Sequence, residues 1–299
     1  MRSLRLRCDD RVVALQRRRE GALGTLYVVG TPIGNLEDIS LRALRILRQV
    51  DLIAAEDTRT TRKLLARYGI ETPFTSYHEH NKLTKLDYLL ETLREKDVAL
   101  VSEAGMPGLS DPGYELIRAA IERGIPVVPV PGPSALVTAL VVSGLPTDSF
   151  VYLGFLPRRR EERRRLLESV ARERRTLVAF EAPHRLLATL ADLKEVLGDR
   201  RIAIARELTK VHEEVWRGTT GEALTRFEET PPRGEFTLVI EGAKEARWDE
   251  ERVRRALRRM LREGVGTREA VKAVAELAGW PKREVYELAL EEGEGDQPR

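Results

Sequence analysis

Cysteine and aromatic residues are scarce in this chain. Its 299 residues include a single cysteine, Cys8, and aromatic side chains make up 5% of the sequence. One cysteine excludes intramolecular disulfides and cysteine-based metal clusters, and it fits a reducing, cytoplasmic setting. The length suffices for two domains with hydrophobic cores and a small third one.

An uncharged segment of 24 residues, Gly124 to Thr147, raises the question of a membrane span. Prolines at positions 126, 129, 131 and 133 interrupt its first half, and proline breaks the interior of a helix. The uncharged helix that remains, about a dozen residues, is too short to cross a bilayer. We therefore expect a buried strand, a Pro-Gly loop and a buried helix, with no membrane association.

Positive charge is concentrated near the N-terminus. The net charge is +3, but residues 1–24 hold seven arginines against three acids, so the rest of the chain carries a slight negative charge. A case for nucleic-acid binding must therefore rest on local clusters of cations. We expect residues 1–23 to be a basic, disordered extension, because the fold pattern begins at Gly24.

From Thr25 onward, apolar strands alternate with amphipathic helices, which predicts crossover connections and a mainly parallel sheet. A second unit opens at Phe150 and is expected to contain a mixed sheet. The predicted strands of the two units are Leu26–Gly30, Leu52–Ala55, Val98–Val101 and Pro126–Val130, then Val151–Phe155, Thr176–Phe180, Ile202–Ala205, Glu214–Gly218 and Phe236–Glu241.

Three short helices are predicted at the C-terminus, near 252–262, 267–277 and 282–290, and their tight turns resemble a helix-turn-helix module. The expected organisation is an α/β domain over 24–147, a second α/β domain over 148–243 and a helical module over 244–299.

Loops rich in glycine and proline follow several predicted strands. They span Gly30–Asn35, Val101–Gly113 and Pro131–Ala135. Ligands of open α/β sheets bind at the carboxyl ends of the strands, so these loops predict one shared crevice. In the second loop, Asp111 is a candidate N-cap and Pro112 the first residue of a helix. The first loop imitates a dinucleotide-binding motif, but it has two glycines instead of three, and Pro32 removes a backbone donor.

Charged side chains also follow predicted strands. Ala55–Arg59 places Glu56, Asp57 and Arg59 directly after a buried strand. Asp57 could merely cap the next helix, but charges facing a crevice favour a functional role. Tyr77–Asn81 contains two histidines without a nearby third ligand, which is weak support for a metal. No metal site is expected.

Arginine clusters occur in two places. The run from Arg158 to Arg175 holds nine arginines and four glutamates, and it is typical either of a solvated, salt-bridged helix or of a patch that contacts phosphates. Arg252–Arg262 has six arginines and no acid, so it is the better candidate for contact with nucleic acid.

Together these motifs resemble the tetrapyrrole-methylase-fold family of S-adenosylmethionine-dependent methyltransferases, and among them the members that act on ribosomal RNA. The resemblance covers about Gly24 to Gly242 and the helical module, with Glu103 where the family usually has Asp. The motifs that carry it are Thr31–Leu36, Ala55–Arg59, His78–Asn81, Ser102–Gly113, Pro131–Pro133, Ser143–Pro146, His184–Arg185 and Arg206–Lys210.

The resemblance implies roles for individual residues. It places the cofactor against Pro32, Ser102, Glu103, Ala104, Gly105, Met106, Ser134 and Ala135. The candidate catalytic residues are Glu56, Asp57, Arg59, Glu207 and Lys210. Arg59 could hold a phosphate, and the general base stays open among the other four. Contacts to RNA are expected from Arg185, Arg252, Arg255 and Arg259.

The same resemblance implies a fold of two α/β domains with the cofactor cleft between them, plus the helical module. It implies a cytoplasmic homodimer that methylates the ribose 2′-hydroxyl of a cytidine in the decoding region of 16S ribosomal RNA, as free RNA or in the small subunit. The alternative is a small-molecule, tetrapyrrole-type methyltransferase, against which the basic C-terminal module argues. A non-catalytic RNA-binding protein is a third possibility, and it would not bind S-adenosylmethionine.

Overall fold

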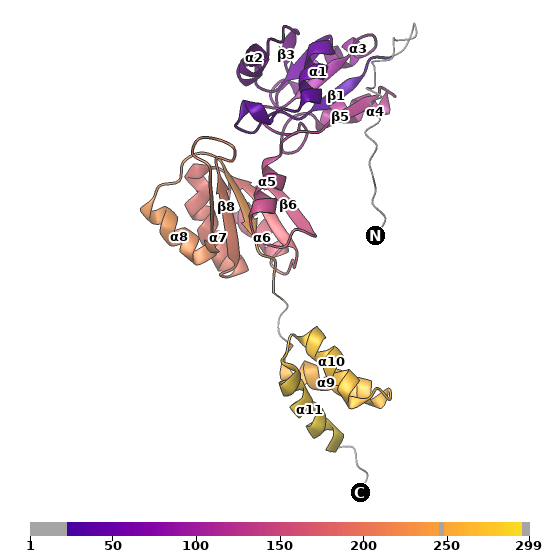
Figure 1. Ribbon diagram of the computed structural model, residues 1–299, viewed down its shortest axis with the longest axis vertical. Helices are drawn as coiled ribbons and strands as arrows, with labels where there is room; N and C mark the ends of the chain where they lie inside the picture. The colour runs from indigo at the N-terminus through magenta and orange to yellow at the C-terminus, as the bar shows by residue number, and fades with distance from the viewer. Residues whose placement is uncertain (1–22, 245–247, 295–299) are drawn as a thin grey trace. The chain divides into compact units, whose positions relative to one another are not determined.

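The computed structural model describes residues 23–244 and 248–294 (Figure 1). The expected basic extension therefore lies outside the described residues, apart from Leu23. The described part of the chain divides into two compact units. One contains two β-sheets, and the other contains the last three helices with residues 170–175.

The first sheet has five parallel strands in the order β3-β2-β4-β1-β5. The strands are β1 (Leu26–Val29), β2 (Leu52–Ala55), β3 (Phe74–Ser76), β4 (Val98–Val101) and β5 (Val127–Val130). The expected parallel sheet is confirmed. The short edge strand β3 was not predicted, because its three half-buried residues show neither a continuous apolar run nor a clear alternation.

Helices cover both faces of this sheet. Helix α1 (Leu41–Gln49) and helix α2 (Thr58–Arg67) share one core cluster with β1 and β2. Helix α3 (Lys82–Thr92) and helix α4 (Tyr114–Glu122) share another with β4. A short 3-10 turn, η1 (Leu36–Asp38), follows the loop after β1. Burial on both faces explains why the central strands read as continuous apolar runs.

The second sheet is mixed, with the order β6-β7-β10-β8-β9, and only β6 and β7 are parallel. The strands are β6 (Phe150–Phe155), β7 (Thr176–Glu181), β8 (Arg201–Arg206), β9 (Glu214–Thr219) and β10 (Phe236–Ile240). Helix α5 (Ala135–Val142), which follows β5 in the chain, packs its apolar face onto this second sheet (Figure 1).

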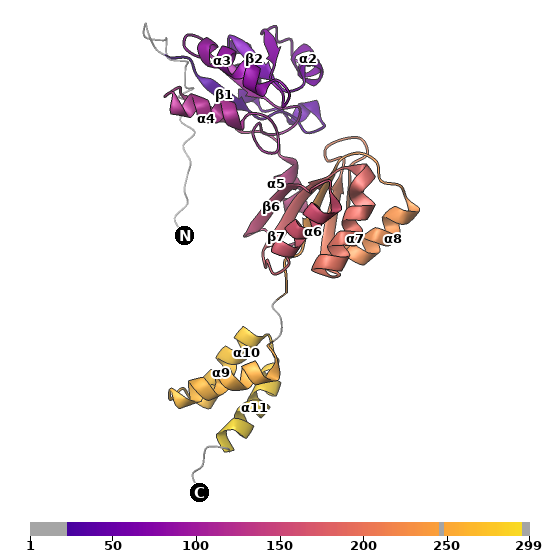
Figure 2. The same cartoon turned by 180° about the vertical axis from the view of Figure 1, so that it is seen from behind.

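The other face of the second sheet is covered by three helices (Figure 2). They are α6 (Arg160–Ser169), α7 (Leu186–Leu197), which continues the 3-10 turn η2 (Pro183–Arg185), and α8 (Thr220–Glu229). The helical module consists of α9 (Glu250–Arg262), α10 (Thr267–Ala278) and α11 (Lys282–Glu294) around its own core. The expected boundaries of the domains, at 147 and 243, remain predictions.

The loop between β4 and α4 differs from expectation. Asp111 does not cap a helix, because α4 begins at Tyr114 and its N-cap residue is Gly113. Gly113 adopts a φ of 142°, a region that side chains rarely occupy, and a Cβ atom there would approach a Leu100 methyl carbon to 3.0 Å. Because it does not cap α4, the Asp111 carboxyl group can make other contacts.

The arginine-rich run is a salt-bridged helix. Arg163 on α6 is 4% exposed, and it binds the 1% exposed Asp192 on α7 through Nη2–Oδ2 and Nε–Oδ2 distances of 2.6 and 2.9 Å. Arg160 adds a contact to the same carboxylate, whereas Arg164 pairs with the more exposed Glu195. Of the two interpretations left open, the structure supports the salt-bridged helix for α6.

In residues 23–244 and 248–294, no helix combines the length and apolar character that a membrane crossing requires. The uncharged segment 124–147 instead forms β5, a loop and the short helix α5.

The buried ion pair yields the first prediction. We expect Asp192→Ala to lower the free energy of unfolding by about 3–5 kcal/mol, because it leaves the buried Arg163 guanidinium without a counterion. Glu195→Ala removes an exposed partner from the same helix and should cost less than about 1 kcal/mol. Urea denaturation of both variants measures the difference, and equal losses would contradict this interpretation.

Candidate active site

A cleft of about 460 Å³ lies within the unit that contains both sheets. The loops after β1, β2, β4 and β5 line one side, and residues at the ends of β6, β7, β8 and β10 line the other. Apolar side chains and a group of carboxylates share the lining. The acids are Glu56, Glu103, Asp111, Glu181 and Glu235, and the one lysine among the described lining residues is Lys210.

The loops after β1 and β4 are joined by backbone hydrogen bonds. Thr31 N donates to Gly105 O at 2.9 Å, and Gly105 N donates to Thr31 O at 3.1 Å. The buried hydroxyl of Ser102 donates to the carbonyl groups of Ala104 and Gly105. These bonds fix the backbone of both loops, so the edge of the cleft is preorganised.

The loops after β1 and β5 touch through two glycines. A Cβ atom on Gly30 would lie 2.7 Å from the Cα of Gly132 and 2.7 Å from the Met106 sulfur. A Cβ atom on Gly132 would lie 2.8 Å from the backbone of Gly30. Only glycine permits this approach, because any side chain would push the loops apart.

Three carboxyl groups gather at the end of the first sheet. Glu56 accepts a hydrogen bond from the backbone N–H of Glu103 at 3.0 Å. Burial, together with the charges of Asp57 and Glu56, raises the pKa of Glu103. Burial and the charge of Glu56 raise the pKa of Asp111 to about 7, although a hydrogen bond with Ser102 opposes the shift. Asp111 is thus suited to exchange a proton near neutral pH.

The loop after β8 holds a different arrangement. Lys210 Nζ lies 3.0 Å from Glu207 Oε1 and 3.1 Å from Glu235 Oε2. Burial opposes protonation of Lys210, but its hydrogen bonds with Glu207 and Glu235 raise its pKa. For Glu207, burial is outweighed by hydrogen bonds from the Glu235 backbone and from Lys210, which lower its pKa. Lys210 therefore stays protonated and cannot accept a proton at neutral pH, whereas Glu207 is ionised but its lowered pKa makes it a weak base.

The loop after β8 contains two residues with left-handed backbone conformations, and a hydrogen bond connects it to the loop after β1. Glu207 and Thr209 have φ angles of 50° and 65°, and Thr209 Oγ1 accepts a hydrogen bond from Asn35 N at 3.0 Å. Non-glycine residues in this left-handed region cost energy and are often found at functional sites.

The predicted site residues separate into two groups in the structure. Those that line the cleft are Pro32, Glu103, Ala104, Gly105, Met106, Ser134, Ala135, Glu56 and Lys210. Ser102 is buried directly behind the lining. Asp57, Arg59 and Glu207 do not line it, and Asp57 caps α2 by accepting bonds from Arg59 N and Thr60 N. The catalytic and cofactor roles of both groups stay predictions.

The predicted RNA-binding arginines lie in different surroundings. The Arg185 guanidinium is 13% exposed, with Nη2 2.6 Å from Glu181 Oε1 and Nη1 donating to Leu156 O. In this position the guanidinium pairs with Glu181, which lines the cleft, and does not face solvent. Arg252, Arg255 and Arg259 lie exposed on α9, where Arg252 stacks over Trp248 and Arg255 pairs with Glu251.

Sequence reasoning missed Asp111 as a site residue and also missed the aromatic wall of Phe155 and Phe180, whose ring centroids are 5.3 Å apart. The Asp-Pro-Gly sequence concealed Asp111, because it also suits a helix start. No local signal marks Phe155 and Phe180, which reach the cleft from two strands. Within the described ranges, no three histidine, cysteine or acidic side chains are arranged to hold a metal ion.

The fold and the cleft define a class of methylase. Residues 25–224 match the tetrapyrrole (corrin/porphyrin) methylases, and residues 247–293 match the RsmI C-terminal HTH domain. Among solved structures, uroporphyrin-III-C-methyltransferase from Thermus thermophilus has a TM-score of 0.52 at 24% identity, covering 72% of this chain and 94% of that one. A cobalt precorrin-4 methyltransferase has a TM-score of 0.54 at 16% identity, covering 73% and 94%.

Relatives with higher identity share one name, ribosomal RNA small subunit methyltransferase I. The protein of Synechocystis sp. is 50% identical, covering 90% of this chain and 98% of its own length. The one from Thermotoga maritima is 53% identical, covering 74% and 99%, and that from Bacillus subtilis is 45% identical, covering 89% and 94%. The chain belongs to the tetrapyrrole methylase family, as the sequence motifs predicted, and within it to the group of these ribosomal RNA methyltransferases.

The raised pKa of Asp111 predicts how its replacement alters stability. A folded-state pKa of about 7, above the ordinary 3.8, means that ionisation destabilises the fold as the pH rises between these values. We therefore expect the melting temperature of Asp111→Asn, relative to wild type, to increase from about pH 4 to about pH 7 and to level off above. Calorimetry at several pH values measures this trend. Asp87→Asn, the same change on an exposed part of α3, is the control. A difference that does not vary with pH would contradict the assignment.

Proposed function

We propose that this protein transfers a methyl group from S-adenosylmethionine to the ribose 2′-hydroxyl of a cytidine in the decoding region of 16S ribosomal RNA. The proposal rests on the carboxylate-lined cleft that the motif loops build. Relatives that match nine-tenths of this chain are named ribosomal RNA small subunit methyltransferase I. The helical module, which matches the RsmI C-terminal HTH domain and carries six arginines on α9, supports RNA as the substrate.

The lining of the cleft fits S-adenosylmethionine. The cofactor is a cationic molecule with a flat purine ring, and the cleft offers Glu56 and Glu103 beside apolar and aromatic side chains. Pro32, Ser102 to Met106, Ser134 and Ala135 would hold it against the fixed backbone of the loops. When bound, it supplies an electrophilic methyl group on sulfur, and no metal takes part in the proposal.

Asp111 is the general base that the geometry favours. A ribose hydroxyl is not ionised at neutral pH, so a neighbouring group must accept its proton as the new bond forms. Among the candidate bases, Glu56 accepts a hydrogen bond from the Glu103 backbone, Glu207 is occupied by Lys210 and the Glu235 backbone, and Asp57 caps α2. Asp111 faces the cleft with a pKa of about 7. Lys210, which stays protonated, would orient an anionic group of the substrate.

A tetrapyrrole substrate is the competing possibility. The tetrapyrrole enzymes among the structural neighbours are less than 25% identical, so they indicate the fold only. The module that matches the C-terminal HTH domain favours the RNA substrate.

The direct test is methyl transfer from radiolabelled S-adenosylmethionine to small ribosomal subunits that lack the modification, followed by nuclease mapping. Label on one cytidine ribose of the decoding region is the expected result. Cofactor binding without transfer to RNA would favour the small-molecule activity, and absence of cofactor binding would favour a non-catalytic RNA-binding protein.

In the same assay, we expect Asp111→Asn to lower kcat by about 10²–10⁴-fold and to leave binding of S-adenosylmethionine intact, because the base acts only on the hydroxyl proton. The wild-type rate should fall as the pH drops below about 7, where Asp111 takes up a proton. The variant should lose this dependence. Asp87→Asn serves as the matched control, and an unchanged pH profile in Asp111→Asn would assign the base to another residue.

We also propose that the protein acts in the cytoplasm as a homodimer. Apolar side chains are exposed on α5 and on the edge strand β6, among them Val137 at 50%, Val141 at 68% and Phe150 at 38%. Clusters of this kind often mark an interface between subunits. Sedimentation equilibrium is expected to give a dimer that Val141→Lys dissociates, whereas a wild-type monomer would contradict the proposal.

A further inference from the structure

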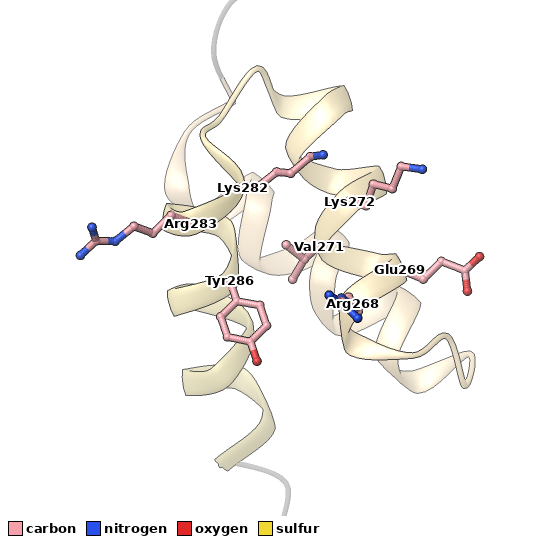
Figure 3. Close-up of a pocket in the computed structure, with 7 residues that line it drawn as sticks. All are labelled: Arg268, Glu269, Val271, Lys272, Lys282, Arg283 and Tyr286. Atoms are coloured by element: carbon pink, nitrogen blue, oxygen red, sulfur yellow. The ribbon is translucent and has the colours of Figure 1, made fainter.

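A groove of about 660 Å³ lies between α10 and α11 of the helical module (Figure 3). Arg268, Val271 and Lys272 line it from α10, and Lys282 and Tyr286 line it from α11. Glu269 and Arg283 stand at its margins, and in Figure 3 their side chains point outward on opposite sides. The lining therefore combines several cations with one aromatic ring.

Of the four cations that line the groove, Arg283 pairs with Glu287 and the other three are not neutralised. Among the side chains that the structure describes, Arg268, Lys272 and Lys282 form no ion pair, and all three are exposed. On α9, two of the six arginines are neutralised in this way: Arg254 pairs with Glu250 and Glu291, and Arg255 pairs with Glu251. Unpaired cations keep a local positive potential that attracts a polyanion. Arg259 and Arg262 on α9 likewise form no ion pair among the described side chains, so the groove adds a second group of unpaired cations to the RNA contacts expected on α9 and at Arg185.

Tyr286 provides the second element of a nucleotide site. Its side chain is 46% exposed, while Val271 beside it is 5% exposed and belongs to the core of the module. A half-exposed ring next to cations is the combination that binds single-stranded nucleic acid, because unpaired bases stack on aromatic rings while cations contact the phosphates. In a duplex the bases are stacked on one another and cannot use the ring.

We propose that this groove binds a single-stranded segment of RNA, with the phosphates at Arg268, Lys272 and Lys282 and an unpaired base stacked on Tyr286. The inference rests on the proposed function and adds to it: the cleft carries out the methyl transfer, and the groove holds an unpaired part of the same substrate RNA. The two sites contribute differently, because the groove supplies affinity and no chemistry.

The phosphate contacts are tested with the full-length protein and a fluorescein-labelled, single-stranded dodecamer of cytidylate, by anisotropy at several salt concentrations. We expect the double variant Lys272→Gln/Lys282→Gln to reduce the salt slope of log Kd by about 1.4, since each phosphate contact on a single strand contributes about 0.7. Arg118→Gln/Arg123→Gln removes the same charge from the exposed surface of α4 and just beyond it, and it should leave the slope unchanged.

The stacking contact is tested at position 286. Tyr286→Ala should weaken binding of the single strand by about fivefold to a hundredfold, whereas Tyr286→Phe keeps the ring and should bind as wild type does. Circular dichroism verifies that each variant remains folded. A duplex of the same length that binds equally well would overturn the stacking role. Competition by polyglutamate at the same charge concentration as RNA would overturn the preference for nucleic acid.

A methylation assay with small ribosomal subunits distinguishes failure of this inference from failure of the proposed function. We expect the groove variants to raise KM for subunits at least fivefold and to retain the wild-type kcat, because the cleft is intact. A wild-type protein that methylates subunits, with groove variants of unchanged KM, would overturn the groove alone. Loss of affinity in Arg255→Gln/Arg259→Gln, with none in the groove variants, would return the RNA contact to α9. A wild-type protein without methyl transfer to RNA would overturn the proposed function itself.

Discussion

The site depends on the direct contact of backbone with backbone among the loops of the first sheet. Gly30 and Gly132 approach too closely for any side chain, and Thr31 and Gly105 exchange two hydrogen bonds. Parallel strands whose carboxyl ends share one edge bring these loops together, and burial of the sheet on both faces holds the strands in place. Since the loops are fixed by main-chain contacts, the side chains between them are free to face the cleft.

This rigid edge explains how carboxyl groups acquire different properties within a short distance. Asp111 is partly buried near the charge of Glu56, and its pKa rises to about 7. Glu207, in the loop after β8, receives hydrogen bonds from Lys210 and from the Glu235 backbone, so its pKa falls. The surroundings of the two groups therefore shift their pKa values in opposite directions, although both are carboxylates. Ionisation of Asp111 destabilises the fold, and the hydrogen bonds that fix the surrounding loops oppose this effect.

The arginines and lysines of the helical module lie in two kinds of surroundings. On α9, Arg254 and Arg255 pair with acids one turn away and Arg252 stacks on Trp248, and these contacts stabilise the helix surface. Between α10 and α11, Arg268, Lys272 and Lys282 form no ion pair with a described acid, although Glu269 lines the same groove, and the ring of Tyr286 is accessible. Helix α9 has six arginines, but Glu250 and Glu251 in its first turn neutralise some of them. The number of arginines in a helix therefore does not by itself give the number of unpaired charges on its surface.

Local chemistry in the sequence determined much of this protein. The alternation of apolar strands and amphipathic helices predicted both sheets, and the glycine- and proline-rich loops at strand ends predicted the cleft and the family. Tertiary structure decided what depends on residues far apart in the chain. It turned Arg185 inward onto Glu181, freed Asp111 by placing the cap at Gly113, and brought Phe155 beside Phe180. Backbone propensity and periodicity act over a few residues, whereas burial, ion pairing and pKa are set by neighbours that only the folded chain assembles.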